Sequence, residues 1–258
     1  MSVQAIDTSV RASVSEAEWK TRVELAAAHR LLAYFGVTDL THNHLTARVP
    51  GEPGHMLIKA ADAMFEEVTA SALEKYDFDG NPAQPGLEKR LAGGGLIIHA
   101  GLFAARADIQ CIFHTHTPAT IGVACQKHGL LPITQHGIRF HGKIAYHDFG
   151  GFEFDMKQRA PLIRDLGDCN IALLRNHGSL VCGGSVGEVF VAHHNLNMAC
   201  EAQVAALAGG GEIIHIAPEV VAYMADQSRR NAGRTSGGGK DWTSCLRLAA
   251  RIAPDFSD

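Results

Sequence analysis

The 258-residue sequence lacks the features that mark membrane and nucleic-acid-binding proteins. It contains no run of about 18 uncharged apolar residues, which excludes a membrane-spanning helix. Its 23 basic and 27 acidic side chains are spread along the chain, so neither a basic patch for nucleic acid nor an acidic tail is expected. The first twenty residues have no apolar core of the kind a secretory signal requires. We therefore expect a cytoplasmic protein without nucleic-acid or membrane partners.

Paired cysteines and aromatic side chains are also scarce. The six cysteines form no CxxC pair and several lie inside apolar runs, which indicates reduced core thiols rather than disulfides or a thiolate metal cluster. There are only 4 tyrosines and 2 tryptophans, against 15 histidines. Histidine is the commonest metal ligand and the side chain that titrates near neutral pH. The histidines are therefore the first candidates for chemistry.

Hydrophobic periodicity predicts a single mixed α/β domain. Ser15 and Glu18 have capping-box spacing at the start of the first long helix, and Gly36 is a plausible stop. Hairpin signals and irregular alternation favour a largely antiparallel sheet with helices packed on it. The expected helices are 15–35, 65–75, 96–106, 119–127, 160–166 and 186–208, and the expected strands include 45–49, 56–59, 109–114, 138–147, 171–174 and 179–182.

The composition changes after Ala208. Two glycine triplets, 209–211 and 237–239, flank a segment that contains three arginines. We therefore expect a domain over 18–208 and a tail over 209–258 that is mobile or in contact with a neighbouring subunit.

Three histidines have spacing typical of a metal site. His114 and His116 end an apolar run, and residues two apart in a strand point to the same side. His177 follows a second apolar strand and precedes a glycine, and loops at strand ends commonly carry functional groups. Three neutral imidazoles without a fourth protein ligand describe a catalytic site with open positions, for Zn²⁺ or a similar divalent ion. By contrast, His99 is expected in the core, and His193 and His194 lie within a long helix.

Four segments in chain order resemble the class II aldolase/adducin family: Asn43–Arg48, Phe65–Thr69, His114–His116 and Arg175–Gly178. The resemblance runs from about residue 18 to residue 208, and an H-x-H pair followed 61 residues later by N-H-G is its most specific part. It implies a three-layer α/β/α fold with a mainly antiparallel central sheet. It also implies a divalent metal held by His114, His116 and His177, with Zn²⁺ first and Mn²⁺ or Co²⁺ as alternatives. Family enzymes are typically homotetramers whose active sites lie between subunits.

The sequence also departs from the sugar-phosphate aldolases of that family. Their acid/base glutamate lies nineteen residues before the first metal histidine, and here that position is Gly95, preceded by Gly93 and Gly94. Their phosphate-binding Gly-Asn element reads Asn43-His44 in this chain. A phosphorylated sugar is therefore not the expected substrate.

Other residues must then move protons. Some family aldolases use a tyrosine lent by the neighbouring subunit, and its approximate counterpart here is His136. An imidazole with a pKa near neutrality suits this role. His44 is a second candidate, and Arg48 is expected either to pair with a substrate carboxylate or to hold a loop. The stretch from Tyr146 to Asp148 is a further possible edge of the site.

Two functions remain open at this point. The first is a metal-dependent lyase that stabilises an enolate or carbanion during decarboxylation or retro-aldol cleavage of a small, non-phosphorylated, carboxylated or hydroxylated molecule. The second is an adducin-like interaction module that is not catalytic but retains a metal site. Animal adducin head domains generally lack the intact histidine triad, so the three histidines favour the enzyme.

Overall fold

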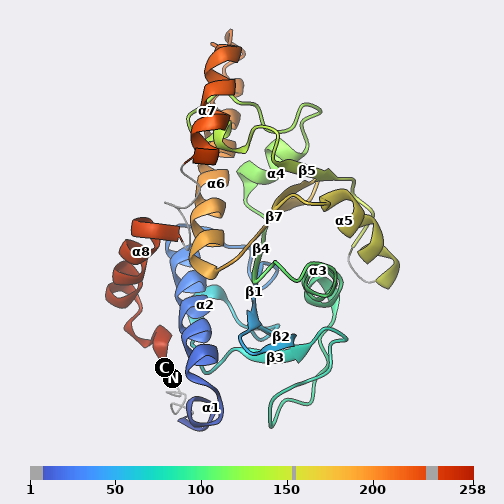
Figure 1. Ribbon diagram of the computed structural model, residues 1–258, viewed down its shortest axis with the longest axis vertical. Helices are drawn as coiled ribbons and strands as arrows, with labels where there is room; N and C mark the ends of the chain where they lie inside the picture. The colour runs from blue at the N-terminus through green and yellow to red at the C-terminus, as the bar shows by residue number, and fades with distance from the viewer. Residues whose placement is uncertain (1–7, 153–154, 231–237) are drawn as a thin grey trace.

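Seven strands form one sheet in the computed structural model, which describes residues 8–152, 155–230 and 238–258. The strand order is β3-β2-β1-β4-β7-β6-β5. Neighbouring strands are antiparallel except for β5 and β6, which run parallel (Figure 1). The strands are β1 (His44–Val49), β2 (Glu52–Ile58), β3 (Glu74–Asp77), β4 (Cys111–Thr115), β5 (Ile144–His147), β6 (Ile171–Leu174) and β7 (Gly178–Gly183).

Helices cover both faces of this sheet, so the fold is a three-layer α/β/α arrangement, as the family resemblance implied (Figure 1). Helices α2, α4 and α6 pack on one face, and α3, α5 and the π-helix η2 pack on the other. The α-helices are α1 (Thr8–Ser13), α2 (Glu16–Tyr34), α3 (Gly101–Ala105), α4 (Pro118–Ala124), α5 (Arg159–Leu166), α6 (Val186–Ala208), α7 (Pro218–Arg230) and α8 (Gly239–Ile252). The short helices are η1 (Phe65–Glu67), η2 (Gly95–Ala100), η3 (Gly137–Phe140), η4 (Met156–Gln158) and η7 (Pro254–Ser257).

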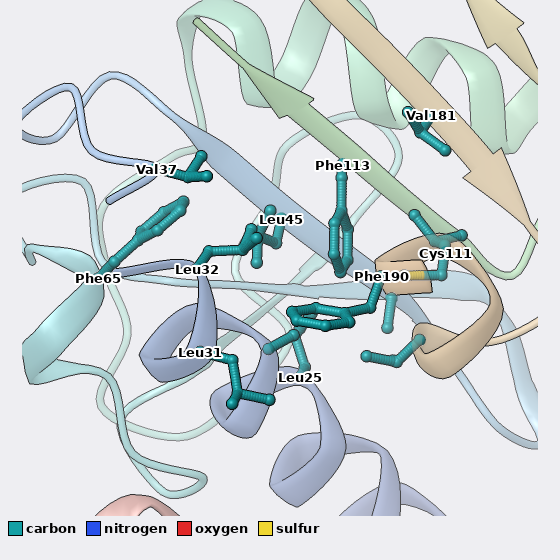
Figure 2. Packing of buried hydrophobic residues seen from close by; sticks show 14 of the residues in the cluster. Leu25, Leu31, Leu32, Val37, Leu45, Phe65, Cys111, Phe113, Val181 and Phe190 are labelled. Carbon is teal, nitrogen blue, oxygen red and sulfur yellow. The ribbon is translucent and has the colours of Figure 1, made fainter. Parts of the chain in front are cut away.

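The larger of the two cores lies between the sheet and helices α2 and α6. Figure 2 shows Leu25 and Leu32 of α2 and Phe190 of α6 on the side of the sheet that carries Phe113 of β4 and Leu45 of β1. Each of these side chains is at most 2% exposed. Full burial of one such side chain is worth about 1.5–3 kcal/mol. This packing holds the inner strands β1 and β4 in place; β1 begins and β4 ends at the site described below.

A buried network of charges ties α2 to the sheet. Ser15 caps the helix by accepting a hydrogen bond from the Glu18 backbone N–H at 3.1 Å. The expected capping box does not close, because the Glu18 carboxylate bonds Arg22 Nε at 2.9 Å and Lys75 Nζ at 2.8 Å instead. Lys75 lies on β3, and all three residues are at most 8% exposed. Loss of one partner would leave a buried charge uncompensated, at a cost of about 3–5 kcal/mol.

Two expected elements differ from the structure. The helix expected over 65–75 is only the 3₁₀ turn η1, because the chain from Glu74 onward pairs with β2 as strand β3. The strand expected over 138–147 is divided into η3 and the four-residue β5. In both cases tertiary pairing outweighs local propensity, which is a weak determinant in short segments.

The region after Ala208 contains helices that the sequence analysis did not assign. Helix α8 packs against α2 and α6, and Trp242, Ala249 and Phe256 belong to the larger core. Asp255 accepts a hydrogen bond from Arg30 of α2 at 2.6 Å. Residues 231–237, which include part of the second glycine triplet, lie outside the described residues. The division into a domain over 18–208 and a tail over 209–258 stays a prediction, with α8 and the C-terminal turn packed on that domain.

The strand topology brings five chain segments to one edge of the sheet. Strands β1 and β7 begin at this edge, while β4, β5 and β6 end there. His44 pairs with His114 across β1 and β4, and His147 lies opposite Leu174 across β5 and β6. His177 occupies the tight turn between β6 and β7. Histidines from distant parts of the chain therefore gather at the same edge.

Buried neutral histidines should make the protein sensitive to acid. Burial lowers the pKa of His29, on α2, to about 3. The unfolded chain binds a proton near pH 6.5 whereas the folded chain does not, so stability falls as the pH drops from 6.5 toward 3. His29→Leu should reduce this fall by up to about 1.4 kcal/mol per pH unit. Urea unfolding at pH 7.5, 6, 5 and 4.5 measures how the free energy of unfolding changes with pH.

The matched control for this measurement is His128→Gln, because His128 is exposed. The control should retain the wild-type pH dependence. An unchanged slope in His29→Leu would show that His29 does not remain neutral in the folded state.

Candidate metal centre

Three imidazole nitrogens converge at the sheet edge. His114 is in β4, His116 follows β4, and His177 lies in the β6–β7 turn. The Nε2 atom of His116 is 3.0 Å from Nε2 of His114 and 3.0 Å from Nε2 of His177. The structure thus brings together the three residues whose spacing suggested a metal site. Their ligand atoms all lie within 4.8 Å of one another. In the described part of the chain, they form the one group of three or more His, Cys, Asp or Glu side chains close enough to share a metal ion.

The other ring nitrogen of two of these histidines is held by an acceptor. His114 Nδ1–H donates to the Ser179 carbonyl at 3.0 Å, and His116 Nδ1–H donates to Asp39 Oδ2 at 2.9 Å. A proton on Nδ1 leaves Nε2 with its lone pair free. Partners of this kind orient ligating histidines and increase their basicity. Both rings are therefore prepared to bind a cation through Nε2.

The backbone around the cluster is equally constrained. The His116 N–H donates to Asn43 Oδ1 at 2.9 Å, which joins the end of β4 to the start of β1. A Cβ atom on Gly178 would lie 2.5 Å from the Thr115 carbonyl oxygen and 2.9 Å from His116 Cδ2. Only glycine permits this approach, so the glycine of the N-H-G segment has a steric role beside the ligands.

Burial keeps the imidazoles of His114 and His177 neutral. Burial is the largest cause lowering the pKa of His114 well below 6.5, followed by the neighbouring His116. Burial also lowers the pKa of His177 to about 4, with smaller contributions from His116 and His147. Neutral imidazole is the form that ligates metals. His114 and His177 are thus in their metal-binding form at neutral pH.

The residues present fit a catalytic divalent ion. Nε2 atoms 3.0 Å apart can each lie about 2.0–2.1 Å from one shared ion, the usual Zn–N distance. Three protein ligands leave positions open for other molecules, whereas structural zinc sites use four. Cysteine contributes nothing here, since all six cysteines are free thiols outside the cluster.

His44 and His99 form a second histidine group beside this cluster. The His44 ring centroid lies 6.2 Å from that of His114 and 5.9 Å from that of His99. A Cβ atom on Gly94 would be 3.3 Å from His44 Cε1, so the glycine triplet borders the His44 ring directly. Burial, followed by the charge of Lys59, lowers the pKa of His44 to about 3. The structure thus places His44 next to the cluster in a neutral, half-buried state.

Arg48 does not reach the cluster. It lies four positions beyond His44 on β1, roughly 13 Å along the strand. Its guanidinium donates to the carbonyl groups of Ile109, Pro53, Phe103 and Arg106 and stacks on the rings of Phe78 and Phe103. Of the two roles expected for Arg48, these contacts favour a structural one, because the guanidinium already bonds four backbone carbonyl groups.

His136 precedes η3, a turn that packs against α6 and α7. It is not part of the three-histidine group and does not line the cavity beside His177. A catalytic role for His136 stays a prediction.

A cavity of about 250 Å³ opens beside His177. Its walls are mostly apolar, with Ile97, Phe149 and Leu162 among them, and its polar lining includes His147 and Lys157. Sequence reasoning marked His147 only as a possible edge of the site and missed Asp39 altogether. The signal for His147 was a histidine directly after an apolar strand, as at His114, whereas Asp39 lies in a loop without any such pattern.

Asp39 offers a test of the metal centre that spares its ligands. Asp39→Asn replaces the charged acceptor of His116 by a neutral one, so zinc affinity should fall about 10- to 100-fold. Competition with a chelating dye measures the dissociation constant. Asp62→Asn, at an exposed position, serves as the control and should bind zinc like the wild type. Equal affinities in all three proteins would remove Asp39 from this role.

Comparison with known proteins agrees with this geometry. The family model described as class II aldolase and adducin N-terminal domain matches residues 23–204. A Pseudomonas aeruginosa protein named "Putative aldolase class 2 protein" is 40% identical, with 98% of each chain covered. Alpha-adducin from Rattus norvegicus is 37% identical over 226 residues, which cover 86% of this chain and 31% of the adducin.

Solved structures show the same relationship. An aldolase II superfamily protein from Pseudomonas syringae superposes with a TM-score of 0.91 at 42% identity, covering 97% of this chain and 100% of that one. An L-fuculose 1-phosphate aldolase from Glaciozyma antarctica has a TM-score of 0.79 at 23% identity, covering 93% and 92% of the two chains, and shares the fold. The family model, the relatives and the histidine cluster agree: this chain belongs to the class II aldolase and adducin N-terminal domain family.

Proposed function

We propose that this protein is a metal-dependent lyase that cleaves a carbon–carbon bond in a small, non-phosphorylated substrate carrying carboxylate or hydroxyl groups. The observation that carries the proposal is the convergence of three Nε2 atoms within a family of which aldolases are members. His114, His116 and His177 hold the ion, with Zn²⁺ first and Mn²⁺ or Co²⁺ as alternatives. When bound, it supplies the positive charge that stabilises the enolate left by decarboxylation or retro-aldol cleavage.

The surroundings of the cluster support a substrate without phosphate. A Cβ atom on Gly95 would lie 3.0 Å from Leu91 Cδ1 and 3.1 Å from Ile58 Cδ1, so apolar side chains close the place of the aldolase glutamate. Asn43 stands where these aldolases have the glycine of their phosphate-binding element. Its side-chain oxygen accepts a hydrogen bond from the His116 backbone N–H. The next position, His44, is a neutral imidazole without a charge for a phosphate. The altered residues thus favour a different substrate on a retained metal centre.

The proposal includes a homo-oligomer, with a tetramer as the expected form. His136 directly precedes η3, which packs against α7. Helix α7 extends beyond the sheet in Figure 1. Tyr223 and Val220 of α7 are 57% and 45% exposed, as is expected of a surface that a second subunit covers. In such an assembly His136 would serve the site of a neighbour.

An adducin-like binding module is the second candidate. The 37% identity to alpha-adducin over 226 residues favours it. In that case the metal centre would be structural, and no small substrate would be turned over. Among the described residues, no helix is both long and apolar enough to cross a membrane.

Metal content tests the proposal directly. Wild-type protein should contain about one divalent ion per chain, and His177→Ala should contain almost none. Zinc at about 100 times its dissociation constant should stabilise the wild type by about 2.7 kcal/mol, or roughly 5–10 °C in Tm. Elemental analysis and calorimetry measure both quantities. His128→Ala is the control, because His128 is exposed and should leave both unchanged.

A substrate panel separates the two candidate functions. It contains small keto and hydroxy acids with and without phosphate, and NMR detects cleavage products in the presence of zinc. Cleavage of non-phosphorylated members by the wild type but not by His177→Ala supports the lyase. A metal-free wild type, or cleavage confined to phosphorylated members, would refute the proposal as stated.

A further inference from the structure

A histidine–aspartate pair lies beside the metal centre and outside the roles assigned above. His147 is the last residue of β5, and its Nδ1 is 2.7 Å from Oδ2 of Asp165 on α5. The two side chains are 19% and 24% exposed, so the pair is neither sealed in the core nor free in solvent. Arg164 donates to the other oxygen of Asp165 at 2.9 Å.

The charge of Asp165 defines which ring nitrogen of His147 carries a proton and which can accept one. The hydrogen bond from His147 is the largest cause lowering the pKa of Asp165, which keeps that carboxylate ionised and accepting. The proton of neutral His147 therefore resides on Nδ1. Nε2, on the opposite side of the ring, carries the free lone pair. The same logic orients the histidine of hydrolase triads, where a carboxylate determines the tautomer.

His147 and His177 line the same cavity. Both are placed by the pairing of β5 with β6, since His147 lies opposite Leu174 and its carbonyl accepts a hydrogen bond from the Arg175 N–H at 2.8 Å. Apolar walls from η2 and α5 surround them. A molecule that fills this cavity would therefore meet both a candidate metal ligand and His147.

The other histidines near the site are less suited to proton transfer. His114, His116 and His177 present their Nε2 atoms to one another, and a bound cation would occupy them. His99 is buried and His44 is half-buried, and neither lines the cavity. Of the histidines described, His147 alone lines this cavity without belonging to the cluster.

We propose that His147, oriented by Asp165, is the catalytic acid–base residue of this site, and the inference rests on the lyase function proposed above. After carbon–carbon cleavage, the protonated imidazole of His147 gives its Nε2 proton to the carbanionic carbon of the enolate. The enolate electron pair forms the new C–H bond, and the carbonyl is restored. Neutral His147 then recovers its Nε2 proton from the hydroxyl of the next substrate as the carbon–carbon bond breaks in a retro-aldol cleavage, or from water, which leaves hydroxide, in a decarboxylation. Asp165 stays ionised throughout and positions the ring.

The first test reads the tautomer without any substrate. In protein labelled with ¹⁵N-histidine, the nitrogen spectrum should show His147 with a protonated Nδ1 and an unprotonated Nε2. Asp165→Asn should shift His147 toward a mixture of tautomers, whereas His141→Gln, at an exposed position, should not. A protonated Nε2 in the neutral wild-type ring would overturn the inference.

The second test follows the reverse proton transfer with pyruvate as the probe. Zinc-loaded protein in D₂O should exchange the methyl protons of pyruvate, because His147 removes a proton to form the enolate and returns a deuteron. His147→Gln should lower the maximal exchange rate by about 100-fold without raising the half-saturating pyruvate concentration, and zinc content should stay unchanged. His141→Gln should exchange like the wild type.

The outcomes distinguish this inference from the proposed function. Wild-type exchange in His147→Gln overturns the acid–base role, whatever the metal content. A zinc-loaded wild type that exchanges no protons also overturns it, while the metal centre stands on its elemental analysis. Loss of zinc in His147→Gln would show that the residue supports the metal instead of moving a proton. Absence of metal in the wild type would refute the lyase proposal itself.

Discussion

The antiparallel pairing of β4 with β7 is the interaction on which the site depends. It places Thr115 opposite Ser179 and so brings the His114–His116 segment next to the turn that carries His177. The pairing also supplies the Ser179 carbonyl that accepts from His114 Nδ1. Because a Cβ atom on Gly178 would lie 2.5 Å from the Thr115 carbonyl oxygen, the two strands reach this register only with glycine at that position. A shift by one residue would turn every side chain to the opposite face.

Strand alternation links the same pairing to the helical layer behind it. Thr115 points away from His114, toward α6, where its Oγ1 lies 2.7 Å from His193 Nε2 and 3.1 Å from Ser179 Oγ. The polar chain from α6 through Thr115 to Ser179 holds the strand that orients His114. Interactions of this kind are effective in a buried environment, since water does not compete for the donors and acceptors.

The residues around the histidine cluster differ from those expected of a sugar-phosphate aldolase, although the three histidines are present. The position of the aldolase glutamate is closed by Leu91 and Ile58, and His44 lies against Gly94. At the other side of the cluster, His147 and Asp165 join β5 to α5 at the cavity. On the proposed function, a metal centre is kept while the groups that move protons come from other strands. A fold hosts several reactions in this way, because the ligand cluster and the proton-transfer groups occupy separate elements.

The sequence by itself determined the family, the three-layer class of the fold and the convergence of three histidines. The three-layer class followed from the resemblance to the family. The positions of the histidines followed from local patterns: a period of two in β4, apolar runs of strand length, and a glycine after His177. The sequence did not determine η1, the start of β3 at Glu74 or α8, because these depend on partners distant in the chain.

Tertiary structure alone decided the roles around the cluster. It assigned Arg48 to backbone carbonyls, placed His136 before a turn that packs on α6 and α7, and paired Asp39 with His116. It also placed His147 and Asp165, eighteen positions apart, at 2.7 Å. The physical reason is that a side chain's role depends on which donors, acceptors and apolar groups surround it. Those neighbours come from strands and helices whose contacts the local sequence does not specify.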